Sequence, residues 1–278
     1  PPLLIVMVFL GMNAFMHHQK RKTKMARADG RTADIKDTKD NPPFFKSLAQ
    51  LMTIPSWWSM CLGIACASFV GYAFSAWQID FLLPLDSIAS EKWGFRKIMY
   101  ALALINGIAY ALGTYAGGVI SEKFAKKTDR AYGLVPVVTV LLALPFGVAS
   151  FWADSLMMHM VFVTIFVVFI GMYLGPSMAI AQTLAPIHMR SMSTAAYFLI
   201  LNIIALGGGP TTVGFLVSAF KPKGCQAMEP CMVEPIRLSM SVAFVMFILS
   251  AAFFAYAAKN LPKDLAEAKK RNALAIEG

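Results

Sequence analysis

Six long apolar segments constrain the fold of this chain more than any other feature of its sequence. They cover residues 56–83, 98–120, 131–151, 156–180, 191–220 and 236–258. Each is long enough to cross about 30 Å of hydrocarbon as an α-helix, which takes roughly 20 residues. Hydrophobic residues make up 58% of the chain and charged residues only 14%, which is typical of an integral membrane protein. We therefore predict an all-α membrane protein with a bundle of six transmembrane helices.

The remaining segments flank this bundle, which is expected over residues 56–259. Leu3–Met16 is apolar but too short to span, and no start methionine or cleavage site precedes it, so residues 1–18 are interpreted as the end of an earlier transmembrane helix. Residues 19–55 are polar and charge-dense, and within them Phe44–Thr53 predicts a short amphipathic helix. Residues 260–278 form a charged tail, for which a second short helix is expected.

Positive charges predict the orientation of the bundle. If the segment 17–46 is cytoplasmic, then 19 of the 25 Lys and Arg residues lie on that side, in alternate loops and in the tail. Because cytoplasmic loops carry an excess of Lys and Arg, the linker and the C-terminus are expected in the cytoplasm and the protein in the cell (inner) membrane. The net charge of +10 is then explained by topology and anionic lipid. No basic face with interleaved aromatics indicates nucleic acid.

Signals for enzyme chemistry or metal binding are weak. The histidines and cysteines do not show the spacing of a metal site or a catalytic motif, so we expect neither an enzyme nor a cofactor. Cys225 and Cys231 fall in a predicted outer loop, where they form either a disulfide or two free thiols. Asp80, well within the first span, is either a solvated residue at the mouth or a buried titrating group.

Polar side chains inside the spans give the strongest functional signal, because such residues usually face the interior of a bundle. Each of these side chains shares a helix face with small or aromatic residues. A substrate cavity is therefore predicted from Phe74, Gln78, Asn106, Tyr110, Phe198 and Asn202. The alternative is that the amides only form hydrogen bonds between helices.

The fifth span contains an unusual break, NIIALGGGPTTVGFLVS at residues 202–218. Glycine and proline weaken a helix, yet the apolar pattern continues beyond them. In lipid such a break is tolerated where protein or a cavity satisfies the freed backbone groups. Gly207, Gly208, Gly209 and Pro210 are therefore predicted as a pivot or bend, with a purely structural kink as the alternative.

These motifs resemble a known family. The stretches GPSMAIAQTLAPIHMRSMSTAA (175–196) and 202–218 are similar to helices 10 and 11 of spinster-like transporters in the major facilitator superfamily. The stretch GGVISEKFAKKTDR (117–130) is similar to their inner loop between helices 8 and 9. Two departures are Ser193, where an alanine is expected, and LVSAF, which lacks an acidic residue.

The resemblance implies the C-terminal half of such a transporter, holding helices 7 to 12 and the end of helix 6. Its expected partners are membrane lipids, a missing N-terminal six-helix half, an amphipathic or lipid-like substrate of lysophospholipid or sphingoid type, and, as in some members of that family, protons. Asp129, Arg130, Gln182 and Arg190 are expected at an inner-loop gate. The alternatives are a carrier of small organic anions or a non-transporting membrane receptor. An anion carrier would need a cation in mid-span; these six spans have none, so the missing half would have to supply it.

Overall fold

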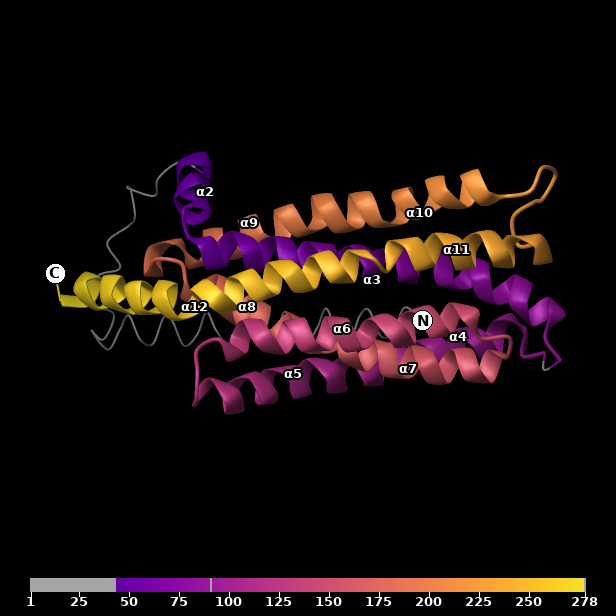
Figure 1. Ribbon diagram of the computed structural model, residues 1–278, viewed down its shortest axis with the longest axis horizontal. Helices are drawn as coiled ribbons and strands as arrows, with labels where there is room; N and C mark the ends of the chain where they lie inside the picture. The colour runs from indigo at the N-terminus through magenta and orange to yellow at the C-terminus, as the bar shows by residue number, and fades with distance from the viewer. Residues whose placement is uncertain (1–43, 91, 278) are drawn as a thin grey trace, which may run out of the picture. The chain divides into compact units, whose positions relative to one another are not determined.

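The computed structural model describes residues 44–90 and 92–277. The predictions for residues 1–18 and 19–43 lie outside the described residues. The chain divides at Pro42–Pro43 into two units, and Figure 1 shows the helices of the second unit. All regular structure in the described residues is helical.

Helices long and apolar enough to cross a membrane number six in the described residues, which confirms the predicted fold. After the short helix α2 (Phe44–Met52), the first span is α3 (Pro55–Ile88). The second comprises α4 (Gly94–Leu104), the π-helical turn η1 (Ile105–Ala109) and α5 (Tyr110–Ala125). The third is α6 (Ala131–Trp152), and the fourth is α7 (Leu156–Met172) with α8 (Leu174–Thr183).

The last two spans are also built from several helical segments. After the 3₁₀ turn η2 (Ile187–Met189), the fifth span runs through α9 (Arg190–Leu201), the π-helical turn η3 (Asn202–Leu206) and α10 (Gly207–Phe220). The sixth follows the 3₁₀ turn η4 (Pro230–Met232) and comprises α11 (Val233–Ala243) and α12 (Met246–Glu277).

Helix α3 is the central helix of this unit. It packs along α12 and also contacts α8, α9, α10 and α11, and Figure 1 shows α11 and α12 running along it. Its side chains Trp57, Ile64, Val70 and Phe81 are fully buried. A helix that is apolar around most of its circumference is expected at the centre of a bundle, because most of its faces then meet protein.

Aromatic side chains fill the core toward the α6–α7 turn. The rings of Phe74 and Phe166 have centroids 4.7 Å apart, and those of Phe81 and Phe151 are also 4.7 Å apart. Such close, tilted pairs are favourable beyond the apolar area that they bury. The cluster joins α3 to α6 and α7.

The charged tail is not a separate helix, in contrast to the expectation from sequence. Helix α12 continues through Pro262 to Glu277. The extension is held by contacts that the sequence did not indicate: Asp264 accepts a hydrogen bond from the Ser56 backbone N–H at 2.8 Å, and Arg271 donates to the Leu184 carbonyl at 2.6 Å. The Asp264 carboxylate thus satisfies one of the free N–H groups at the N-terminus of α3.

Candidate functional site: a hollow with aromatic and polar walls

A hollow of about 280 Å³ lies between four of the spans. Its walls come from α3, from the η1 turn with α5, from α7 and α8, and from α9. The lining residues are Ser68, Gly71, Tyr72, Ser75, Asn106, Tyr110, Ile170, Tyr173, Leu174, Phe198 and Leu201. Binding sites for small molecules typically combine mainly apolar walls with a few convergent polar groups, and this lining has that character.

Hydrogen bonds orient the polar side chains of the hollow. The Ser68 hydroxyl and the Tyr173 phenol are 3.2 Å apart and share one hydrogen bond. Ser75 donates to the Gly71 carbonyl at 2.9 Å, and Asn106 donates from its amide nitrogen to the Leu102 carbonyl at 2.9 Å. The Asn106 amide oxygen takes no part in that bond, so it can accept a hydrogen bond from a ligand.

Of the six residues predicted for the cavity, Asn106, Tyr110 and Phe198 line this hollow. Asn202 is not in the lining; its amide donates to the Phe198 carbonyl at 2.7 Å. Asn106 and Asn202 each lie in a π-helical turn, and the amide of each donates to the carbonyl four residues earlier. Single π-helical turns inside α-helices occur frequently at functional sites.

The structure places Phe74 and Gln78 elsewhere, in the buried core on a different side of α3. Phe74 packs between Phe151 and Phe166, and Gln78 is 4% exposed with no hydrogen-bond partner for its amide nitrogen in the described residues. The α3 side chains that line the hollow include Ser68, Tyr72 and Ser75 instead. Around the helix axis, this face is rotated from the predicted face by roughly 100°, the angle between successive residues of an α-helix.

Ser68, Tyr72 and Tyr173 were not identified from the sequence as lining residues. A signal was present on α3, since Ser68, Tyr72 and Ser75 recur at the spacing i, i+4, i+7 of one helix face. The competing face of Phe74 and Gln78 had the same periodicity and a stronger mixture of amide and aromatic groups. Periodicity alone does not distinguish two adjacent faces of a helix when both faces combine polar and aromatic residues.

The predicted pivot directly follows the η3 turn. The backbone N–H of Gly207 donates to the carbonyl of Asn202, five residues earlier, and Pro210 lies inside α10. The Pro210 carbonyl accepts a hydrogen bond from the Trp77 indole at 3.1 Å. An added Cβ at Gly209 would lie 2.5 Å from the Phe69 carbonyl oxygen, so this glycine lets α10 approach α3 closely.

The four predicted gate residues all lie near the basic end of the bundle, where the α5–α6 turn meets α8 and α12. Asp129 lines a hollow of about 370 Å³ together with Glu122, Lys126 and Lys269. The side chains of Arg130, Gln182 and Arg190 are exposed. In the described part of the chain, no ion pair connects members of this predicted set.

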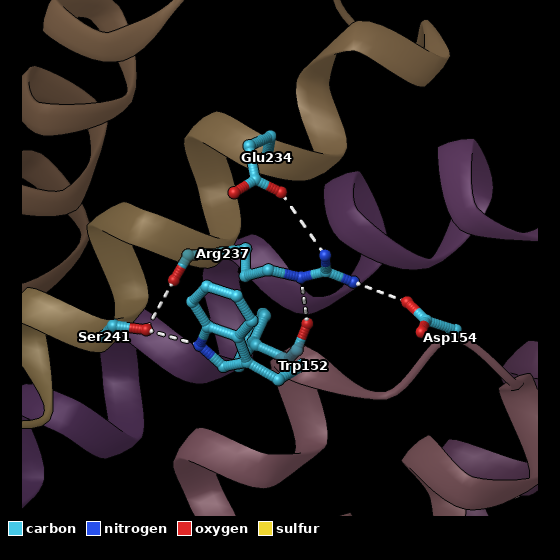
Figure 2. Close-up of polar contacts among 6 residues, drawn as sticks. Trp152, Asp154, Glu234, Arg237 and Ser241 are labelled. Carbon is cyan, nitrogen blue, oxygen red and sulfur yellow. Dashed lines mark hydrogen bonds and ion pairs between the residues drawn. The ribbon is translucent and has the colours of Figure 1, made fainter.

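The opposite end of the bundle carries a disulfide and a polar cluster. Cys225 and Cys231 form a disulfide in the loop between α10 and η4. Figure 2 shows the cluster around Arg237, whose guanidinium donates to the Phe151 carbonyl at 2.7 Å and pairs with Asp154 at 3.2 Å and Glu234 at 3.3 Å.

The Trp152 ring completes this cluster. The guanidinium carbon of Arg237 lies 5.2 Å from the centroid of the ring, within the range of a cation–π contact. The indole nitrogen donates to the Ser241 hydroxyl at 3.0 Å (Figure 2). These contacts hold the turn between α6 and α7 against α11. In the sequence, Arg237 is a single charge at the start of the predicted span 236–258, and none of these contacts could be read from it.

Comparison with solved structures finds two inward-facing forms of a bacterial homologue of the human lysosomal transporter Spinster. The unoccupied form matches with a TM-score of 0.70 and 26% sequence identity, over 84% of this chain and 53% of that chain. The occupied form matches with a TM-score of 0.63 and 24% identity, over 77% of this chain and 51% of that chain. No family model and no curated protein sequence matches the chain.

These matches confirm the resemblance to spinster-like transporters that the helix 10 and helix 11 motifs indicated. The chain spans about half the length of the solved transporters. It is an integral, multi-pass membrane protein with the helical fold of that transporter class.

Proposed function

We propose that this chain is the C-terminal half of a secondary active transporter that moves an amphipathic or lipid-like solute by alternating access. In such carriers the substrate site lies near the middle of the membrane, between two bundles that rock against each other. The second bundle would be an N-terminal half with six helices. The similarity to the bacterial Spinster homologue supports this proposal.

The composition of the hollow is the observation that carries the proposal. Phe198, Ile170 and Leu201 offer apolar surface, and Asn106, Tyr110 and Tyr173 offer hydrogen-bonding groups. A lysophospholipid or a sphingoid compound likewise combines a hydrocarbon chain with a polar headgroup. None of the eleven lining residues is charged, so this hollow supplies no cation for a small organic anion, whereas its apolar surface can hold a hydrocarbon chain.

The two π-helical turns support the conformational part of the proposal. They lie in the second and fifth spans, at Ile105–Ala109 and Asn202–Leu206, and Asn106 and Phe198 from these spans line the hollow. A π-helical turn has a weaker hydrogen-bond pattern than the α-helix around it and commonly marks a functional site. A bend at these two levels would change the width of the hollow.

The proposal is tested by comparing two tyrosines of the same helix. Tyr110 lines the hollow, whereas Tyr115, five residues later, is 74% exposed and absent from the lining. The complete transporter is reconstituted into liposomes, and uptake of a fluorescent lysophospholipid is measured. We expect Tyr110→Ala to reduce uptake about tenfold, the effect of losing roughly 1.4 kcal/mol of transition-state stabilisation, and Tyr115→Ala to preserve it.

Equal uptake by the wild type and the Tyr110→Ala variant would contradict the assignment of the hollow as the substrate site. Uptake of a small organic anion in place of the lysophospholipid, again sensitive to Tyr110→Ala, would retain the site but replace the lipid-like substrate. Thermal unfolding of both variants in detergent identifies any loss of uptake that comes from misfolding.

A further inference from the structure

A second hollow, outside the one assigned to substrate, lies between α5 and α6 with α7 at its base. Its volume is about 400 Å³. Its walls include Phe124 from α5 and Leu134, Val138 and Leu142 from α6, and Phe169 and Met172 come from α7. We refer to these six residues as the lateral groove.

The lateral groove presents hydrocarbon to its surroundings. Thr128 and Thr139 also line it, but both hydroxyls are engaged locally: Thr139 donates to the Pro136 carbonyl at 3.1 Å, and Thr128 accepts from the Arg130 backbone N–H at 3.3 Å. Phe124 and Val138 are 52% and 53% exposed. Because α5 and α6 are membrane-spanning, a concave apolar surface on them meets lipid chains rather than water.

Close contact between α5 and α7 forms one side of the groove. An added Cβ at Gly113 would clash with the Val168 carbonyl oxygen, and one at Gly117 would clash with that of Met172. Small residues at this spacing let helix backbones approach each other in a membrane. Helix α5 therefore lies directly on α7, and the space between α5 and α6 remains open toward their connecting turn.

Three cations are direct sequence neighbours of residues that line the groove near this turn. Lys123, Lys127 and Arg130 each directly precede a lining residue, namely Phe124, Thr128 and Ala131. All three cations are exposed, and in the described part of the chain none of them is in an ion pair. The nearby Glu122, Lys126 and Asp129 line the separate polar hollow beside α8 and α12.

From this combination we infer a binding site for an anionic membrane phospholipid. One acyl chain occupies the lateral groove, and the phosphate headgroup pairs with Lys123, Lys127 and Arg130. The two parts of the site match the two parts of such a lipid. The groove lies along the spans, where the acyl chain of a leaflet lies, and the cations lie at the membrane surface, where its headgroup lies. The charge distribution predicts that this end of the bundle lies in the cytoplasm. There, anionic lipids attract basic segments next to the membrane. The inference does not depend on the proposed transport function.

The site is tested by photo-crosslinking of the full chain in nanodiscs. The probes are phosphatidylglycerol and phosphatidylcholine that carry the same diazirine-bearing acyl chain, and the labelled peptides are identified by mass spectrometry. We expect phosphatidylglycerol to label the region from Ile120 to Leu142 several-fold more than phosphatidylcholine does. The Val138→Trp variant, which fills the groove, should lower this labelling at least fivefold.

The headgroup part of the site is tested separately with Lys123→Gln/Lys127→Gln. Losing two cations near the membrane surface should reduce the preference for phosphatidylglycerol about tenfold or more, while labelling by phosphatidylcholine remains. These lysines are exposed, so this variant keeps the test valid if Val138→Trp does not fold. Matched controls are Ile248→Trp, at an exposed apolar position on α12, and Lys221→Gln/Lys223→Gln, in the loop after α10; both should match the wild type.

Equal labelling by the two lipids in the wild type would overturn the inference. Unchanged labelling in both groove and lysine variants would do so as well. Crosslinks between two copies of the chain at Leu134 or Val138 would assign the groove to a protein contact instead.

Discussion

The Ser193 side chain makes hydrogen bonds that the resemblance to spinster-like transporters does not indicate. The Trp57 indole donates to the Ser193 hydroxyl at 2.7 Å, and that hydroxyl donates to the Ala181 carbonyl at 2.6 Å. Ser193 is fully buried, and the relay joins α3, α8 and α9. The alanine expected here from the resemblance could not make either bond.

We therefore expect Ser193→Ala to destabilise the bundle. The substitution leaves the buried Trp57 N–H without its acceptor, which costs about 1–3 kcal/mol. Thermal unfolding in detergent, followed by fluorescence, should show a lower midpoint for this variant. The neighbouring Thr194→Ala is the control, because among the residues that the structure describes the Thr194 hydroxyl binds just the Arg190 carbonyl of its own helix. Equal midpoints for Ser193→Ala and the wild type would show that the relay adds nothing to stability.

At the scale of an element, the fifth span combines the predicted pivot with a packing contact. Gly208 and Gly209 lie against Phe69 of α3, whereas Gly207 has the Asn202 carbonyl, 3.9 Å from an added Cβ, as its nearest neighbour. The glycine cluster thus contains positions with different environments. Single substitutions can separate close packing from backbone flexibility.

Gly209→Ala should destabilise the protein, because the new methyl group would lie 2.5 Å from the Phe69 carbonyl oxygen. Overpacking of this kind typically costs about 1–3 kcal/mol. Gly207→Ala should leave stability unchanged or raise it by up to about 1 kcal/mol, since alanine favours the helix. The measurement is unfolding in detergent by circular dichroism.

Lipid uptake by the same two variants distinguishes the roles of the cluster. A stable Gly207→Ala protein that loses transport would support a pivot. Equal stability of the wild type and Gly209→Ala would contradict the packing role assigned to Gly209.

At the scale of the whole molecule, the distribution of charge predicts the topology. Ser87 lies at the end of α3, and Lys126 lies in the turn between α5 and α6, so they should lie on opposite sides of the membrane. Cysteines introduced singly at these positions are labelled in intact cells with a maleimide that does not cross the membrane. We expect labelling at position 87 but not at position 126.

The native cysteines provide little background in this experiment. Cys61 and Cys66 are buried, and Cys225 and Cys231 are joined in a disulfide. Permeabilised cells serve as the control, since position 126 should then react. Labelling of both positions in intact cells would contradict the predicted orientation.

The number and approximate limits of the six described spans followed from the sequence. Crossing a bilayer as a helix requires a continuous apolar segment. The sequence of that segment alone decides whether it meets this requirement, whatever the rest of the chain does. The motifs in residues 175–196 and 202–218 were also local, and they identified the transporter class that the solved structures confirm.

The rotation of each helix and the partners of its polar groups were decided only by tertiary structure. Ser68 and Tyr72 face the hollow while Phe74 and Gln78 face the core, yet both sets recur with helical periodicity. The relay through Ser193 and the contact of Asp264 with Ser56 join residues that are 136 and 208 positions apart. In a membrane both the lipid and the protein core are apolar, so hydrophobicity does not specify which face of a span turns inward. That choice depends on the shapes and hydrogen-bonding groups of neighbouring helices.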